Sequence, residues 1–340
     1  MRYGDRQHMK KTNKAVDILK RIFLTMLFPL VIYVVMFILT RSRGITYYGL
    51  TVDMWRTVLV NSSMTGVAAL AIWLQVKNGR FDFSGGATMV LTAILAGNIV
   101  IQNHQGPVVY LILCILFAMI LCTITGIIYI VGRLPIMICT IGVALLYESI
   151  TYLVFDAQGL IMMSNTKLTI FGRMPYILIV LAIALFVFVG YSYFTVSGKR
   201  AKLLANNQQA AVNIGINEKK NVIQTFVVCG VLLGCAAAIY GSNNTVAPQS
   251  GLSTANTLFS NIIPAFMGMF VGAASVDAIG VVVAAFGMEI LNYGLSCLGY
   301  GAGGWQQIIV GSFMLLFYTI TAQWPRIQAA RAKKARMNEA

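Results

Sequence analysis

Charged residues are scarce in this sequence. Asp, Glu, Lys and Arg together make up 10% of its 340 residues, whereas 58% are hydrophobic. A water-soluble chain carries about 25% charged residues, so the composition excludes a soluble fold of this size, whose surface could not be covered with polar groups. Lipid is the expected solvent for most of the chain. We therefore predict an all-α, polytopic membrane protein with a single membrane domain.

Motifs for catalysis and nucleotide binding are missing. The sequence has no GxxxxGK[ST] phosphate loop, and no GxGxxG follows a strand-like segment. The two histidines, His8 and His104, belong to opposite sides of the membrane in the topology derived below, which excludes a histidine-based catalytic pair or metal site within one chain. We predict that the chain is not an enzyme and binds no cofactor or metal.

Acidic residues are few as well: 10 stand against 25 basic residues, and the formal net charge is +15. In a soluble protein this charge would suggest a nucleic-acid partner. Here the basic residues gather in clusters between apolar runs and form no face interleaved with aromatic residues. This distribution is typical of membrane proteins that follow the positive-inside rule, and no nucleic-acid partner is predicted.

Long apolar runs are abundant. A helix needs about 20 residues to cross the hydrocarbon core of a bilayer, and polar residues, Gly or Pro separate the runs that reach this length. They predict ten membrane spans, at 22–40, 55–76, 84–101, 108–131, 135–155, 175–196, 221–241, 258–275, 278–297 and 305–324. The predicted membrane domain is 22–324, and basic tails at 1–21 and 325–340 flank it.

The positions of Lys and Arg orient these spans. An even number of spans puts both termini on one side, together with Lys77, Arg80, Arg133 and the basic loop 197–221. The positive-inside rule assigns this side to the cytoplasm, and we expect a bacterial plasma (inner) membrane. The loops of the other side hold few basic residues, namely Arg41, Arg43, Lys167 and Arg173.

The loop 197–221 is the longest polar stretch between two spans, and it contains the segment ANNQQAAVNIGINEKK. On a short helix the small side chains of Ala210 and Ala211 allow close approach of a partner. Gly215 can end that helix with a positive φ. The segment is either an ordinary helix-turn linker or a handle that a soluble partner grips.

The same segment resembles the cytoplasmic coupling segment of ABC importer permeases, in which a Glu-Ala-Ala triplet precedes a Gly. Its tail Gly-Ile-Asn resembles the simple-sugar branch (ribose, galactose and xylose), to which branched-chain amino acid permeases are a sister group. Gln209 replaces the acidic residue of the triplet, so a neutral hydrogen bond would replace an ion pair with the motor. The resemblance implies that the ATPase-coupling residues are Asn206, Asn207, Gln209, Ala210, Ala211, Gly215, Ile216 and Asn217.

Two further segments resemble sugar permeases. NGRFDFSGGATMVL, at 78–91, has Asp82 and Ser84 at the Asp and Ser of the family, and an Asp at this place can cap the helix that follows. GWQQIIVG, at 304–311, opens the last span with Trp305 and Gln306. Indole and amide groups there suit an aromatic belt at the membrane surface or hydrogen bonds to a polyol.

Polar groups inside the apolar runs are costly and invite a functional interpretation. Glu148 and Glu289 are the deepest ionisable residues. A proton relay would need more carboxylates facing one cavity, so hydrogen bonds between helices or a weakly polar path for a solute are favoured. The candidates for this translocation path are Asn61, Asp82, Ser84, Glu148, Asn261, Glu289, Asn292, Trp305 and Gln306.

The resemblance extends over about four fifths of the chain, from near Asp53 to Trp324. It implies a permease that works with a cytoplasmic ABC ATPase, which consumes ATP and Mg²⁺, with an extracytoplasmic solute-binding protein and with a second permease copy or a paralogue. The expected solute is a small sugar, a pentose or hexose, and autoinducer, nucleoside and branched-chain amino acid are alternatives. An ion-coupled secondary transporter that uses Glu148 or Glu289 is an alternative of another class.

Overall fold

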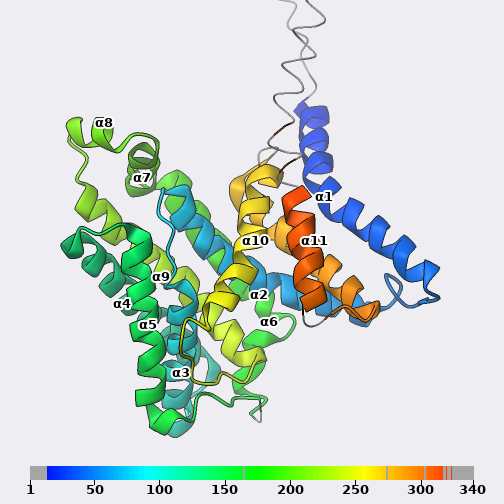
Figure 1. Ribbon diagram of the computed structural model, residues 1–340, viewed down its shortest axis with the longest axis horizontal. Coiled ribbons are helices and arrows are strands. Elements are labelled where there is room, and N and C mark those ends of the chain that lie inside the picture. Colours follow the sequence, from blue (N-terminus) through cyan, green and yellow to red (C-terminus); the bar gives the residue numbers. More distant parts are fainter. Residues whose placement is uncertain are drawn as a thin grey trace, which may run out of the picture.

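A computed structural model describes residues 14–163, 165–272, 275–301, 304–316, 319 and 323. Helices joined by loops make up this part of the chain (Figure 1). Its single isolated β-bridge pairs Leu160 with Val246. The predicted all-α class is confirmed.

The helices follow one another along the chain with short connections. Two short 3₁₀ turns, Phe155–Ala157 and Leu168–Gly172, lie between α5 and α6. The named helices are α1 Lys14–Ser42, α2 Val52–Lys77, α3 Gly85–Gln102, α4 Pro107–Gly132, α5 Ile136–Leu153, α6 Tyr176–Val189 with a π turn Gly190–Phe194, α7 Val196–Asn206, α8 Gln208–Asn213, α9 Glu218–Asn243, α10 Ala255–Gly272 and α11 Asp277–Cys297.

Within the described residues, nine helices are long and apolar enough to cross a membrane. They coincide with the first nine predicted spans. The tenth, 305–324, begins in a further helix, Gly304–Leu316, and most of its second half lies outside the described residues. The C-terminal tail and residues 1–13 lie outside them too. Residues 14–21 of the predicted N-terminal tail already belong to α1, because a charged helical turn can continue a spanning helix beyond the lipid.

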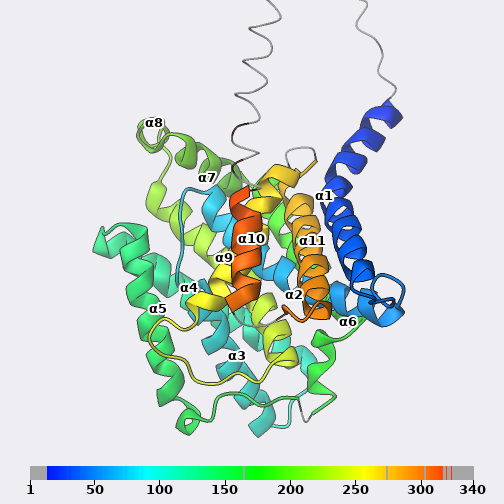
Figure 2. The same cartoon turned by 45° about the vertical axis from the view of Figure 1, so that its right-hand side comes forward.

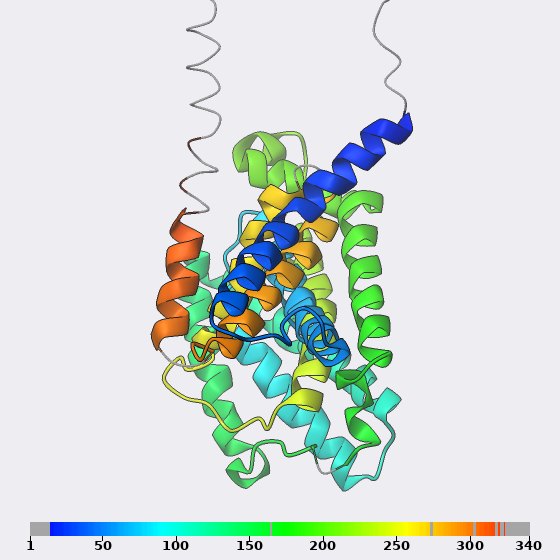
Figure 3. The ribbon, with the colours of Figure 1, turned by 90° about the vertical axis from the view of Figure 1, so that its right-hand side faces the viewer.

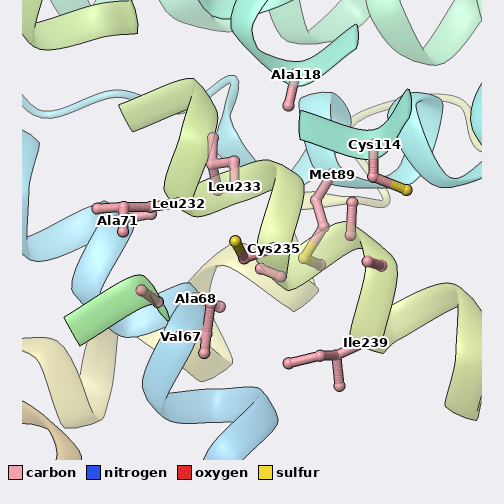
Figure 4. Packing of buried hydrophobic residues seen from close by; sticks show 14 of the residues in the cluster. Val67, Ala68, Ala71, Met89, Cys114, Ala118, Leu232, Leu233, Cys235 and Ile239 are labelled. Atoms are coloured by element: carbon pink, nitrogen blue, oxygen red, sulfur yellow. The ribbon is translucent and has the colours of Figure 1, made fainter. Parts of the chain in front are cut away.

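The core of the membrane domain surrounds α9. Val67, Ala68 and Ala71 of α2 approach α9 from one direction, and Cys114 and Ala118 of α4 from another (Figure 4). Beyond its first turn α9 has no charged residue and is rich in Gly, Ala and Cys. A helix that is apolar all round is stable when neighbours cover it on all sides, which is the position α9 occupies.

Small residues set how closely α9 approaches α4. Gly230 and Gly234 are four residues apart and therefore on one face of α9. A methyl group at Gly230 would lie 2.6 Å from the Met119 Cα, and one at Gly234 would lie 2.5 Å from the Ile115 Cα. The two backbones thus pack in direct contact, as in the small-xxx-small pairs of membrane helices.

This contact predicts a strong effect of one added methyl group. We expect Gly234→Ala to destabilise the protein by about 1–3 kcal/mol, the usual cost of overpacking, because the α4 backbone must move. Gly142→Ala in α5 is the matched control, since nothing lies within 4 Å of the added atom. Thermal unfolding in detergent should show a lower midpoint for Gly234→Ala alone. Equal midpoints for the two variants would contradict the direct backbone contact.

A second core unites α1, α2, α10 and α11. Met36 of α1, Met54 of α2, Met267 of α10 and Met288 of α11 are buried in it. The flexible methionine side chains fill irregular gaps between helices that cross at different angles. This core holds α11, which carries Glu289, against both α2 and α10.

The two faces of the molecule differ. The Lys14 end of α1, the Leu316 end of the last helix, α7 and α8 all lie on one side (Figures 2 and 3). On the other side the loop after α5 and the loop after α9 join through the bridge between Leu160 and Val246. Asn98 of α3 donates a hydrogen bond of 2.7 Å from Nδ2 to the Gly159 carbonyl oxygen and holds the first of these loops.

Candidate functional site

The segment after α6 forms a helical projection from α7 and α8 at one end of the molecule (Figure 1). Asn207 separates the two helices with extended backbone angles, φ −155° and ψ 99°. Its side-chain Oδ1 accepts a hydrogen bond of 3.0 Å from the Ala210 backbone N–H. An Asn at this position satisfies one of the free N–H groups of a helix start, which explains why the chain begins a new helix here.

The end of α8 agrees with the sequence expectation. Gly215 has φ +89°, in the left-handed region that favours glycine, and its N–H donates to the Val212 carbonyl at 2.9 Å. The chain then turns so that Ala211, Ile216 and Leu204 of α7 form a small buried cluster. The predicted positive φ at Gly215 is confirmed, and the cluster fixes α8 against α7.

The projection exposes an apolar surface that the sequence analysis did not single out. Val212 and Ile214 are exposed, the latter by 71%. They adjoin the exposed residues Gln209 and Ala210. From the sequence these two apolar side chains would be expected to be buried. They stay exposed because α8 is short and ends at Asn213, next to Ile214. Exposed apolar groups beside small ones are typical of a docking surface.

The remaining predicted coupling residues frame the projection. Asn206 is the last residue of α7. Asn217 is the N-cap of α9, and its Oδ1 accepts from the Lys220 N–H at 3.0 Å. All eight predicted coupling residues therefore lie on α8, at the helix ends next to it or, for Gly215 and Ile216, in the turn between α8 and α9.

Hydrogen bonds tie the base of the projection to α9. The Asn221 Nδ2 donates to the Ser197 carbonyl at 2.8 Å, and the Ser197 hydroxyl donates to the Gln224 Oε1 at 2.8 Å. The hydroxyls of Tyr191 and Thr225 are 2.8 Å apart in the interior. A displacement of α7 and α8 therefore acts directly on the first turns of α9.

Two adjoining cavities lie between the helices of the membrane domain and open at the exposed residues Asn256 and Ser260. The first, about 390 Å³, lies between α2, α10, α11 and the helix Gly304–Leu316. The second, about 340 Å³, lies between α2, α3, α9, α10 and α11. They share four polar lining residues: Thr65, Asn256, Ser260 and Glu289.

Glu289 stands where the two cavities meet. Its Oε1 accepts a hydrogen bond of 3.0 Å from the Thr65 hydroxyl, which joins α11 to α2. Hydroxyl and amide groups line both cavities, and no Lys or Arg of the described residues does. The cavities thus combine hydrogen-bonding groups, a single carboxyl group and apolar walls.

Several other predicted path residues belong to these cavities. Asn292 and Gln306 line the first, where the Gln306 Nε2 donates to the Asn292 Oδ1 at 3.4 Å. Asn261 lines the second, and its Nδ2 donates to the Thr257 carbonyl at 2.7 Å. Asn61 and Trp305 line neither cavity. Trp305 is 66% exposed, which agrees with a place at the membrane surface.

Glu148 has a different place from the one predicted. It is fully buried and lines neither cavity. One carboxylate oxygen accepts from the Leu252 N–H at 2.7 Å, and the other accepts from the Thr254 N–H at 2.8 Å and from the Thr254 hydroxyl at 2.6 Å. Its carboxylate holds the loop between α9 and α10, so in this conformation it is a structural residue and not part of a path.

Asp82 and Ser84 likewise lie away from the two cavities. The Asp82 Oδ1 accepts from the Ser84 N–H at 2.8 Å and from the Ser84 hydroxyl at 2.7 Å. Asp82 was expected to cap the N–H groups of the helix, but α3 begins at Gly85 and the carboxylate instead closes a turn before it. Burial raises the pKa of Asp82, and the hydrogen bonds from Ser84 oppose this shift. Both residues shape the entry into α3.

Within the described part of the chain, no three His, Cys, Asp or Glu residues lie close enough together to hold a metal ion. The chemistry that the site offers is therefore hydrogen bonding along the cavities and mechanical contact at the projection.

A bundle of spanning helices with polar-lined cavities and a helical projection at one end is the arrangement expected of a membrane subunit of a transport system. Residues 54–318 match the model of the family described as "Branched-chain amino acid transport system / permease component". The match covers most of the chain, and the chain belongs to this family.

Membership makes the chain a transmembrane permease of an ABC transport system and a transport subunit instead of an enzyme. The family includes sugar permeases, and its members work in the general context of an ATPase and a solute-binding protein. No curated protein and no solved structure matches the sequence.

Proposed function

We propose that this permease forms the path for a small sugar, a pentose or hexose, in an ABC importer of a bacterial plasma membrane. The observation that carries the choice of solute is the lining of the two cavities. It offers hydroxyl, amide and carboxyl groups and, among the described residues, no basic side chain.

The chemistry of the alternatives supports this choice. A sugar is uncharged and presents many hydroxyl groups, which can exchange hydrogen bonds with Thr65, Asn256 and Ser260 while passing the Glu289 carboxyl. A branched-chain amino acid carries an ammonium and a carboxylate group, and each buried charge needs a partner of opposite sign. Glu289 could pair with the ammonium, but no described lining residue of either cavity offers a cation to the carboxylate. The lining therefore favours a neutral polyol.

We assign the projection of α7 and α8 to contact with the ATPase subunit, which would bind ATP and Mg²⁺. The Lys14 end of α1, the Leu316 end of the last helix and the basic residues of α7 lie on this side, which the positive-inside rule assigns to the cytoplasm. A solute-binding protein would dock on the opposite face, and a second copy of the permease or a paralogue would complete the transporter.

The hydrogen bonds at the base of the projection give a route for coupling. Closure of the ATPase would move α8 and α7, and the contacts of Ser197 with Asn221 and Gln224 would pass this motion to α9. Tyr240 of α9 lines the second cavity, so its walls would shift. The ATPase needs only to favour one of two arrangements of the helices to change which side the cavities face.

Uptake into proteoliposomes tests the proposal. The permease is reconstituted with an ABC ATPase and a solute-binding protein that co-purify with it, and uptake of radiolabelled ribose, xylose, galactose and leucine is measured. We expect ATP-dependent uptake of at least one sugar and none of leucine. Uptake of leucine alone would refute the sugar assignment. Uptake that persists without the ATPase and collapses with an ionophore would identify an ion-coupled transporter.

A further inference from the structure

A third cavity lies outside the proposed path. It measures about 280 Å³ and is formed by the end of α4, the first turn of α9 and Gln208 of α8. Arg133 and Lys219 bring two positive charges to it. Both are exposed, and neither forms an ion pair with another described residue. The cavity thus holds cations that the chain itself leaves available.

A third cation stands behind this cavity. Arg80 is buried with 6% exposure, and its Nη1 has no hydrogen-bond partner among the described residues. It interacts electrostatically with Tyr129 and Glu218, which both line the cavity. A buried guanidinium normally has all its N–H groups bonded or a counter-charge beside it. Glu218 is the one acidic lining residue, so with Arg133, Lys219 and Arg80 nearby the positive charge is in excess.

The surroundings of the cavity indicate where an anion would come from. Arg133 directly follows the last residue of α4, and the apolar side chain of Ile130 lines the cavity beside it. The adjoining Leu134 is exposed and lines the cavity too. A basic cavity at the end of a spanning helix, with an apolar wall and an exposed apolar edge, matches a phospholipid, whose headgroup and acyl chains need these two surfaces side by side.

We infer that the crevice between α4 and α9 binds the headgroup of an anionic phospholipid. The phosphate lies between Arg133 and Lys219, Tyr129 lines the same crevice, and the acyl chains leave it over Leu134. This inference needs only the membrane location of the chain and is independent of the transported solute.

Native mass spectrometry of the full-length permease tests the site. The purified protein is titrated with phosphatidylglycerol and with phosphatidylcholine of the same acyl chains. We expect tighter binding of phosphatidylglycerol to the unmodified chain. Each basic residue near an anionic headgroup contributes about fivefold in affinity, so R133Q/K219Q should weaken this binding on the order of 30-fold. E218Q, which removes the opposing charge, should strengthen it.

The matched control is R200Q/K202Q. It removes one Arg and one Lys from exposed positions of α7, on the same side of the molecule but outside the cavity. Retained binding in this control together with loss in R133Q/K219Q supports the site. Equal loss of binding in both variants would overturn the proposal, and so would equal binding of the two lipids. Displacement of phosphatidylglycerol by millimolar inorganic phosphate would also overturn it, because the cavity would then be a site for free phosphate.

Discussion

Glu148→Ala is expected to be the most destabilising single change in this permease. The carboxylate accepts hydrogen bonds from the backbone N–H groups of Leu252 and Thr254 and from the Thr254 hydroxyl. Alanine leaves all of these donors without an acceptor in a fully buried place. Each buried donor without a partner costs about 1–3 kcal/mol, so we expect a loss of at least about 3 kcal/mol and a loosened loop between α9 and α10.

Thermal unfolding in detergent and limited proteolysis of the loop 244–254 measure this effect. Glu148→Gln should lower the unfolding midpoint less, because its amide oxygen can still accept a hydrogen bond from one of the loop's N–H groups. Ser149→Ala is the control on the same helix. Its hydroxyl bonds only the Leu145 carbonyl at an exposed place, and its loss should leave the midpoint unchanged. A midpoint for Glu148→Ala close to that of Ser149→Ala would show that the carboxylate does not hold the loop.

Gly215→Val is expected to uncouple the permease from its ATPase while the membrane domain stays folded. A β-branched residue resists the left-handed conformation that Gly215 adopts, so the end of α8 must change shape. Nothing lies within 4 Å of the position of the new Cβ, and α8 projects from the bundle. The backbone strain is therefore confined to the projection of α7 and α8. ATP-driven uptake should drop by on the order of tenfold or more, a factor that lies within the usual range of coupling between two sites.

Gly44→Val is the matched control for Gly215→Val. Gly44 has φ +78°, also with nothing within 4 Å of an added Cβ, and it lies in the loop after α1. The same backbone strain is thus introduced far from α8. Co-purification of the ATPase and ATP-driven uptake should fall for Gly215→Val and persist for Gly44→Val. Normal uptake by Gly215→Val would remove α8 as the coupling element and leave the ordinary-linker interpretation.

Much of the architecture follows from local features of the sequence. Apolar length predicts each span because a helix satisfies its own backbone hydrogen bonds in lipid. The order Ala210, Ala211 and Gly215 predicts the end of the short helix α8, since a positive φ is a property of a single residue. These features need no knowledge of which helices touch.

The polar residues inside the spans show where this reasoning ends. Glu148 and Glu289 look alike in the sequence, as single carboxyl groups in apolar runs. In the structure Glu148 binds the loop between α9 and α10, whereas Glu289 lies where two cavities meet. The spans are apolar on nearly all sides, so they lack the polar stripe that would indicate how each helix is rotated.

The sequence by itself thus determined the membrane class, the first nine spans, which ends of these spans lie on the same side, and the short helix that ends at a left-handed glycine. These features depend on hydropathy and backbone conformation, which act over a few residues. Tertiary structure alone decided that Thr65 meets Glu289, that Glu148 clamps a loop more than a hundred positions further on, and that Arg133 and Lys219 share a cavity. These contacts depend on the rotation and close packing of distant helices, which glycines such as Gly234 permit and no local pattern records.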